Sequence, residues 1–117
     1  MLRSYLHQCR PGYQREGLGA TTTLPQGEKL SESFHVYGMI WKPGSITLYF
    51  DDPSNVIAHY TPADLPAGAK WPFDDGKFFF ILNIAVGGAW GGNPTPSTQF
   101  PQTMLVAFVH VWQLNTK

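Results

Sequence analysis

The carboxylates of this chain lie in positions that do not suit acid–base catalysis. A retaining glycosidase needs two carboxyl groups about 5–5.5 Å apart, and residues of one strand share a face only when they are two positions apart. The pairs Asp51–Asp52 and Asp74–Asp75 are adjacent and lie in turn-rich stretches, where aspartate commonly caps its own backbone. The two glutamates of residues 27–33 lie in the polar segment GEKLSES, which predicts a solvated loop. The sequence therefore predicts no catalytic residue pair.

Other catalytic and metal-binding patterns are also missing. The four histidines are far apart, lack the spacing of a metal site, and are predicted to have structural or surface roles: His7, His35, His59 and His110. The glycine-rich stretch VGGAWGGNP, residues 86–94, has no Lys-Ser/Thr pair of the kind that a phosphate loop needs. No nucleophile-elbow motif supports a Ser-His-Asp triad. We therefore expect no metal ion and no cofactor.

Aromatic and amide side chains form the remaining pattern with chemical meaning. Trp71 and Trp90 lie beside turns at the two ends of the apolar run at residues 77–86, and Asn83 interrupts that run. Aromatic rings can stack on the C–H faces of a sugar, and an amide can bond its hydroxyl edge. The alternative is that Asn83 is a buried amide with hydrogen-bond partners and that the two tryptophans fill loops.

The elements that must position these residues are predicted to be β-strands. Residues 34–41 (FHVYGMIW) and 46–51 (ITLYFD) are rich in strand-forming residues and flank the turn KPGS. In that turn Pro43 presets φ and Gly44 allows a positive φ. The pattern predicts a hairpin, followed by a third strand at residues 56–60 and preceded by one short strand near residues 19–24.

Two longer strands are predicted in the second half of the chain, at residues 77–86 and 103–114, with loops at 61–76 and 87–101. Both faces of the last strand are apolar, which is typical of an inner strand of a sandwich. Trp41 and Trp112 lie within predicted strands and are expected in the core. Ten prolines and twelve glycines fall between short apolar runs, so the fold class is predicted to be all-β with antiparallel strands.

Composition excludes several classes of protein. The 117 residues are enough for one domain, predicted as 1–117. Eight basic residues balance eight acidic ones, which argues against binding to nucleic acid or to an anionic membrane. No apolar run approaches the roughly 20 residues that span a bilayer. Cys9 is the single cysteine and excludes an intrachain disulfide. The first residues lack the apolar core of a signal peptide, so the compartment is not predicted.

Three segments resemble glycoside hydrolase family 16. FHVYGMIWKPGSITLYFDD looks like a hairpin of that family, and WPFDDGKFFFILNIAVGGAWGGNP followed by FPQTMLV looks like the C-terminal part of its laminarinase-type (1,3-β-glucanase) members. LHQCRPGYQREGLGATTTLP is more weakly similar to the part that follows the catalytic strand. The chain thus resembles the C-terminal half of such a domain.

The resemblance implies a fold and a set of sugar-binding residues. The fold would be half, or a compacted form, of a concanavalin A-like jelly-roll β-sandwich with a cleft for β-glucan. Asn83 matches an asparagine that faces the cleft, Trp71 and Trp90 match aromatic residues near it, and His7 matches a cleft-side histidine. Members are typically secreted, which implies an extracellular location.

Two departures from the family pattern bear on activity and assembly. The catalytic motif glutamate-x-aspartate-x-(x)-glutamate is absent from this chain. Ala107 replaces an aspartate that helps to bind a structural calcium in many members, which puts that calcium site in doubt. Phe108, His110 and Trp112 replace tyrosine, arginine and tyrosine and make the last strand more apolar. Half a sandwich exposes apolar faces, so we expect a homodimer or another self-association to cover them.

Three hypotheses for function remain open. The first is recognition of laminarin-type β-glucan by a fold that lacks the catalytic carboxylates and does not cut as an isolated chain. The second is that the chain is part of an active retaining endo-β-1,3-glucanase whose catalytic strand lies outside it. The third is a folded gene fragment with no selected function.

Overall fold

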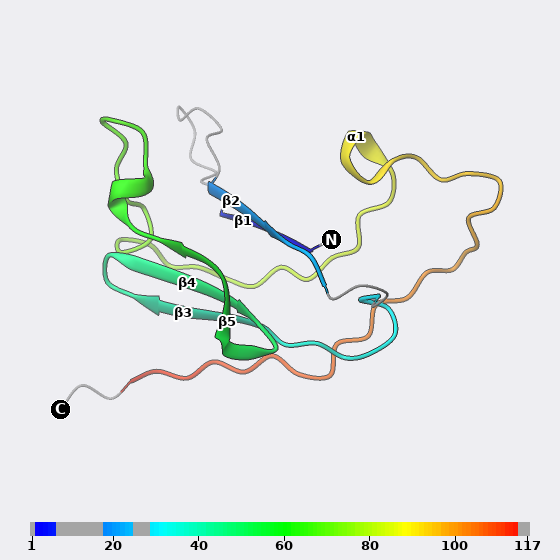
Figure 1. Ribbon diagram of the computed structural model, residues 1–117, viewed down its shortest axis with the longest axis horizontal. Helices are drawn as coiled ribbons and strands as arrows, with labels where there is room; N and C mark the ends of the chain where they lie inside the picture. Colours follow the sequence, from blue (N-terminus) through cyan, green and yellow to red (C-terminus); the bar gives the residue numbers. More distant parts are fainter. Residues whose placement is uncertain (1, 7–17, 25–28, 115–117) are drawn as a thin grey trace. The chain divides into compact units, whose positions relative to one another are not determined.

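The computed structural model describes residues 2–6, 18–24 and 29–114 (Figure 1). His7 lies outside these ranges. The chain divides into two compact units, Met1–Lys77 and Phe78–Lys117. All strands among the described residues pair antiparallel, so the predicted all-β class is confirmed and the chain has the character of a jelly-roll fragment.

The first unit holds a two-stranded sheet made of β1 (Leu2–Leu6) and β2 (Leu18–Thr22). The register pairs Leu2 with Thr22 and Leu6 with Leu18. The short strand expected near residues 19–24 is confirmed as β2, whereas β1 was not predicted. β2 also contacts β5 of the second sheet, so the two sheets of this unit meet there.

The second sheet contains the predicted hairpin. β3 (Tyr37–Lys42) and β4 (Ser45–Phe50) pair from Tyr37 with Phe50 to Lys42 with Ser45. Pro43 and Gly44 alone form the turn, and Gly44 has a φ of 70°. A positive φ at this position is the conformation that glycine adopts without steric cost. The turn and both strands confirm the prediction to within a few residues.

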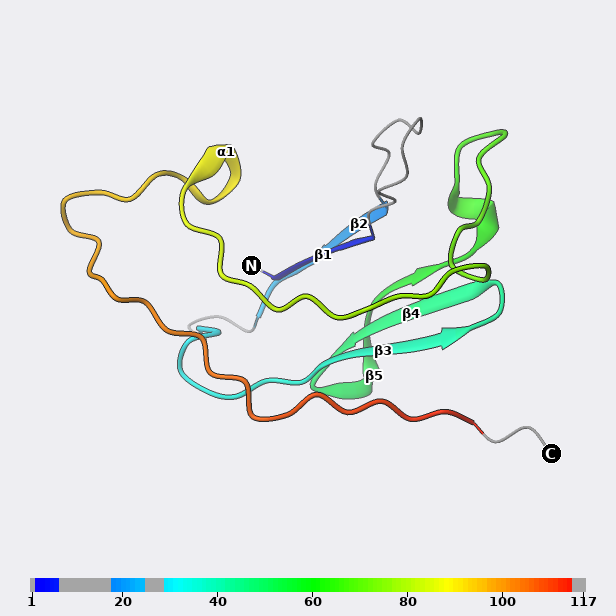
Figure 2. The ribbon, with the colours of Figure 1, turned by 180° about the vertical axis from the view of Figure 1, so that it is seen from behind.

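β5 (Asp52–Tyr60) completes the order β3-β4-β5, which both views show (Figures 1 and 2). Asp51 alone separates β4 from β5 and has a φ of 61°, a conformation that aspartate tolerates better than most residues. Irregular pairing around Tyr49 bends this edge of the sheet. The third strand was predicted to begin at residue 56. It begins earlier because Asp52 already pairs with Phe50, while residues 53–55 fall in the irregularity between that pair and the pair of Tyr49 with Val56.

The core of the described residues is small and is centred on β4. Its buried apolar residues are Ile46, Phe50 and Tyr60, with Ile46 only 1% exposed. The register places Ile46 between Trp41 and Tyr60 on the neighbouring strands. Trp41 is 41% exposed, so its expected place in the core is wrong. An edge strand such as β3 has a neighbour on one side only, which leaves part of a large ring open to solvent.

The loop predicted for residues 61–76 contains one turn of 3₁₀ helix, η1 (Pro62–Asp64). The Asp64 carboxylate accepts hydrogen bonds from the backbone N–H and the hydroxyl of Thr61, at 2.7 and 2.9 Å. This arrangement caps the turn at Thr61, the residue before its first residue. No helix among the described residues is long and apolar enough to span a membrane.

The second unit differs from its prediction. Its one described helical turn is α1 (Gly88–Gly91), and residues 78–86 and 103–114 are extended without forming a strand. Phe79 and Ile81 are 82% and 71% exposed, and Trp112 is 79% exposed. The two predicted strands, and the core position predicted for Trp112, are therefore wrong for this chain.

The physical reason is that alternation alone does not make a strand. A strand exists through ladder hydrogen bonds to a neighbour, and within the described part of the chain no ladder includes these residues. In the hairpin, β3 and β4 are each other's partner, and only two residues separate them. Residues 78–86 and 103–114 carry the same kind of pattern without a nearby partner.

Candidate functional site

Trp71 is the predicted sugar-binding residue with the most defined surroundings. It is half-buried in the segment that follows η1. Its indole Nε1–H donates a hydrogen bond to Asp74 Oδ1 at 3.1 Å. Its ring packs edge-to-face on Phe73, with the ring centroids 4.9 Å apart and the planes at 72°. Two neighbours in sequence therefore fix the orientation of the indole.

Asp74 links this segment to the hairpin. The backbone N–H of Gly44 donates to both Asp74 carboxylate oxygens, at 3.0 Å each. Aspartates in turns were predicted to cap their own backbone, and for Asp74 that is wrong, because its partner turn lies 30 residues earlier. A carboxylate accepts up to four hydrogen bonds, and only the tertiary fold brings Gly44 within reach.

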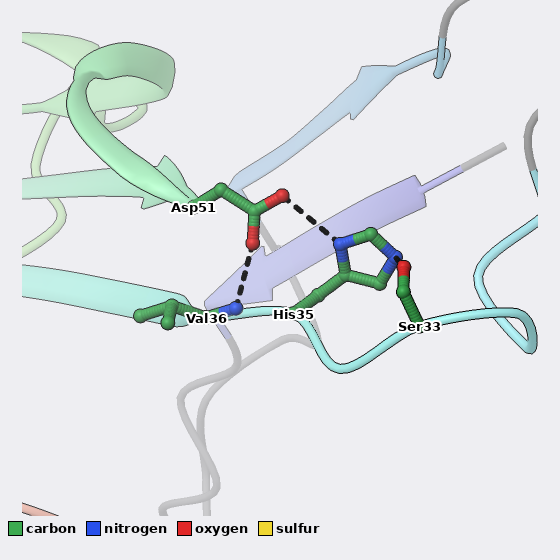
Figure 3. Close-up of polar contacts among 4 residues, drawn as sticks. All are labelled: Ser33, His35, Val36 and Asp51. Carbon is green, nitrogen blue, oxygen red and sulfur yellow. Dashed lines mark hydrogen bonds and ion pairs between the residues drawn. The ribbon is translucent and has the colours of Figure 1, made fainter.

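A second polar group ties the start of β3 to the turn between β4 and β5 (Figure 3). Asp51 Oδ2 lies 2.9 Å from His35 Nδ1, and Asp51 Oδ1 accepts from the backbone N–H of Val36 at 2.8 Å. The Asp51 N–H donates to the Val36 carbonyl at 2.8 Å. His35 Nε2 lies 2.9 Å from Ser33 Oγ. Because a carboxylate only accepts, His35 carries a proton on Nδ1, and in the neutral ring Nε2 then accepts from Ser33.

Ser33, His35 and Asp51 have the connectivity of a Ser-His-Asp triad, but their geometry favours a structural role. A nucleophilic serine also needs backbone donors for an oxyanion, and the Val36 N–H is already used by Asp51. The His35 ring stacks on the buried Phe50 ring at 4.8 Å. Hydrogen bonds from His35 and then from the Val36 N–H hold the pKa of Asp51 below its usual range. The hydrogen bonds among these residues therefore stabilise the sheet.

Aspartates with a lowered pKa are poorly suited to act as a general acid. Hydrogen bonds from Ser54 lower the pKa of Asp52, and those from Thr61 lower the pKa of Asp64. A general acid must hold its proton near neutral pH, which requires a raised pKa. For Asp52, whose Oδ1 accepts from the Ser54 backbone N–H at 2.8 Å, the predicted capping of its own turn is confirmed.

The other predicted residues lie in the second unit or outside the described ranges. Asn83 is exposed within the extended residues 78–86, so the alternative of a buried, satisfied amide is wrong for this chain. The backbone of Trp90 lies in α1. Trp71 belongs to the first unit and both of these residues to the second. The joint cleft of Trp71, Asn83, Trp90 and His7 therefore stays a prediction.

The backbone of the glycine loop around Trp90 has the positive φ angles that its glycine-rich sequence favours. Gly87, Gly88 and Gly92 have φ values of 80°, 94° and 76°, a region in which other residues are strained. The side-chain oxygen of Asn93 accepts from the Gly88 N–H at 3.3 Å. The backbone of Trp90 thus lies in a tight turn between Gly88 and Gly92, whose φ values favour glycine.

His59 and His110 both contact other side chains among the described residues. His59 Nδ1 lies 2.8 Å from Thr47 Oγ1 across the β4–β5 pair. His110 stacks on Phe108 at 4.6 Å and meets Trp112 edge-to-face at 5.2 Å. Within the residues that the structure describes, no group of three or more His, Cys, Asp or Glu side chains could hold a metal ion. The doubt about a calcium site at Ala107 stays a prediction.

Comparison with known proteins identifies the type of domain. The chain is 33% identical to glucan endo-1,3-beta-glucosidase A1 of Niallia circulans over 101 residues, which are 81% of this chain and 14% of that protein. It is 39% identical to a beta-glucanase of Rhodothermus marinus over 83 residues, 68% of this chain and 29% of that protein. It is 32% identical to a keratan-sulfate endo-1,4-beta-galactosidase of Sphingobacterium multivorum over 110 residues, 92% of this chain and 25% of that protein.

These relatives confirm the resemblance to glucanases of the glycoside hydrolase family 16 type over most of the chain. The chain corresponds to part of a domain of this type. It spans less than a third of the length of each of these three relatives. No protein-family model matches the chain, and no solved structure gives a significant match.

Proposed function

We propose that this chain recognises β-glucan of the laminarin type and does not cut it as an isolated chain. The observation that carries the proposal is the fixed, half-buried indole of Trp71 in a chain whose relatives are named as glucan-cleaving enzymes. The lowered pKa values of Asp51, Asp52 and Asp64 support the absence of cutting, since none of these groups is tuned as an acid.

The proposed binding residues are Trp71, Asn83, Trp90 and His7. Affinity electrophoresis of the full chain in gels that contain laminarin tests them one at a time. We expect Trp71→Ala and Trp90→Ala each to lose retardation, because a stacked aromatic ring contributes a large share of contact area. Trp112→Ala is the matched control, since it removes an equally large but 79% exposed ring with no proposed sugar contact.

The outcomes separate the hypotheses. Retardation that is equal in the parent and the Trp71→Ala and Trp90→Ala variants would contradict the proposed residues. No retardation of the parent in laminarin would favour the folded fragment without a selected function. Retardation in gels with keratan sulfate but not laminarin would move the proposal to galactose-containing glycans, which the name of one relative suggests.

A second candidate is that the chain forms part of an active retaining endo-β-1,3-glucanase. The observation in its favour is the exposure of residues 78–86 and 103–114, whose apolar runs match strands that lack their neighbours. A reducing-sugar assay on laminarin tests whether the isolated chain cuts. Release of reducing ends by the pure chain would overturn the proposal that the isolated chain is non-catalytic.

We also propose that the chain self-associates, as a homodimer or a larger assembly. Large exposed apolar side chains follow one another along residues 78–86, and contiguous apolar surface of this kind favours association. Light scattering coupled to gel filtration measures the mass directly. A single species at the 13.0 kDa of one chain would exclude self-association at the concentration used.

A further inference from the structure

We infer that Asp74 is a positioning residue for Trp71: it holds the indole by its N–H edge, so that Trp71 meets a sugar through its ring face. This inference rests on the proposed role of Trp71 in glucan binding. It adds a residue that the sequence placed in a self-capping turn and that carries no sugar contact of its own.

The geometry converges on one carboxylate. Asp74 Oδ1 accepts from Trp71 Nε1 at 3.1 Å and from the Gly44 N–H at 3.0 Å, and Oδ2 accepts from the same N–H at 3.0 Å. Hydrogen bonds to an ionised acceptor are roughly twice as strong as those between neutral groups. Asp74 therefore connects the indole to the hairpin turn by charge-assisted bonds at both ends.

The hairpin turn is a firm anchor. Lys42 and Ser45 pair directly across it, and Gly44 sits at a φ of 70° in a two-residue turn. Its N–H points to Asp74, so the carboxylate is held by an element with little freedom of its own. Movement of the indole would therefore break its hydrogen bond to a carboxylate that stays on this turn.

The bond to Asp74 determines which part of Trp71 is available. An indole has one hydrogen-bond donor and no acceptor, and that donor is occupied by Asp74. Trp71 therefore has no polar group left for a sugar hydroxyl, and the ring is additionally fixed by the edge-to-face contact with Phe73. We expect it to select the flat C–H face of a pyranose rather than its hydroxyl pattern.

Fixing the ring before binding also affects affinity. Ordering a side chain with several rotamers on binding costs about 0.5–1.5 kcal/mol. A ring that Asp74 already holds does not incur that cost. Removing Asp74 should therefore weaken glucan binding by about two- to thirteenfold without removing any proposed sugar contact.

The test uses the ¹⁵N-labelled full chain and two readouts. Trp71→Phe identifies the Trp71 indole N–H signal among the four tryptophans, and its exchange rate with water is then measured. We expect faster exchange and a moved signal in Asp74→Ala, an intermediate result in Asp74→Asn, which keeps an oxygen acceptor, and no change in Asp75→Ala. Laminarin affinity is measured on the same proteins and should follow the same order.

Each outcome decides the inference. An indole signal that is unchanged in Asp74→Ala would show that Asp74 does not hold the ring. A changed signal with unchanged laminarin affinity would overturn the positioning role. If the parent does not bind laminarin, the proposed function fails, whereas the exchange rate still decides whether Asp74 fixes Trp71. Should the signals of the other three tryptophans collapse in Asp74→Ala, Asp74→Asn decides with the same two readouts.

Discussion

The sheet β3-β4-β5 and residues 78–86 are two regions with similar sequences and different structures. Both carry alternating or continuous apolar residues and aromatic rings. β4 is paired on both sides and contains Ile46 and Phe50 of the small core, whereas residues 78–86 are extended, exposed and outside any described ladder. The two regions differ in whether a partner strand lies nearby. A two-residue turn places β3 and β4 side by side, and no turn of this kind precedes residue 78. Strand-forming sequence is therefore not sufficient for a strand.

The largest expected effect comes from truncating one isoleucine in each region, which tests whether the two regions differ in packing. Ile46→Ala should lower the free energy of unfolding by about 2–4 kcal/mol, because it removes three carbons from the most buried side chain and leaves a cavity. Ile81→Ala removes the same atoms from a side chain that is 71% exposed. This variant should change the free energy of unfolding by less than about 0.5 kcal/mol. Urea unfolding followed by circular dichroism measures both. Equal losses would mean that residues 78–86 are packed as tightly as β4.

A methyl group added to Gly38 probes packing within the sheet. The ring of Tyr49 lies directly over Gly38, where a β-carbon would overlap it. Gly38→Ala should therefore cost about 1–3 kcal/mol of unfolding free energy through overpacking. In a Tyr49→Leu background the same change should cost much less, and the double-mutant cycle reports the coupling. Independent, additive effects would contradict the close approach of the ring.

Backbone strain can be compared between the hairpin turn of the sheet and the glycine loop that follows residues 78–86. Gly44 and Gly92 have φ values of 70° and 76°, and a β-carbon at either would meet nothing within 4 Å. Gly44→Ala should lower the unfolding free energy by about 1 kcal/mol, because the hairpin turn must form for the sheet to fold. Gly92→Ala carries similar strain outside the sheet and should leave the unfolding of the sheet nearly unchanged. A larger effect of Gly92→Ala would reverse the comparison.

The smallest expected effect concerns pH. The pKa of Asp51 is lowered in the folded chain, first by the hydrogen bond with His35 and then by that of the Val36 N–H. The ionised carboxylate is thus the form that stabilises the fold. Its contribution is complete above the ordinary aspartate pKa of about 4 and is lost as the pH falls through the lowered value.

The expected size of that loss is less than about 1 kcal/mol, because the Asp51 side chain is 47% exposed and water screens it. Unfolding free energies from pH 6 to pH 2.5 should therefore fall more in the parent than in Asp51→Asn, which cannot titrate. A parent and variant with parallel pH profiles would contradict the role given to His35 and Asp51.

Sequence patterns predicted the local parts of this molecule well. The hairpin, its Pro43–Gly44 turn and the strand at β2 were predicted to within a few residues because the turn residues and the alternation lie next to each other in the chain. The resemblance of FHVYGMIWKPGSITLYFDD and the WPFDDG segment to glucanases was also correct, since motif residues are read directly from the sequence.

Non-local contacts were not predictable in the same way. Asp51 and Asp74 both seemed to be self-capping turn residues by type and position. The Asp51 partners His35 and Val36 and the Asp74 partner Gly44 lie on other segments, 30 residues away for Gly44. Trp71, the second partner of Asp74, lies in the same segment. One possible signal was present: Asp74 follows Trp71 by three residues, a spacing at which an aspartate in a turn can reach an indole N–H.

The sequence by itself determined the all-β class, the hairpin and the family resemblance, because short-range turn chemistry and residue identity are sufficient for them. Only the tertiary structure decided which carboxylates hold which segments and which apolar runs become strands. The physical reason is the same for both: a hydrogen bond or a ladder needs two partners in space, and alternation in one segment does not say where the second partner lies.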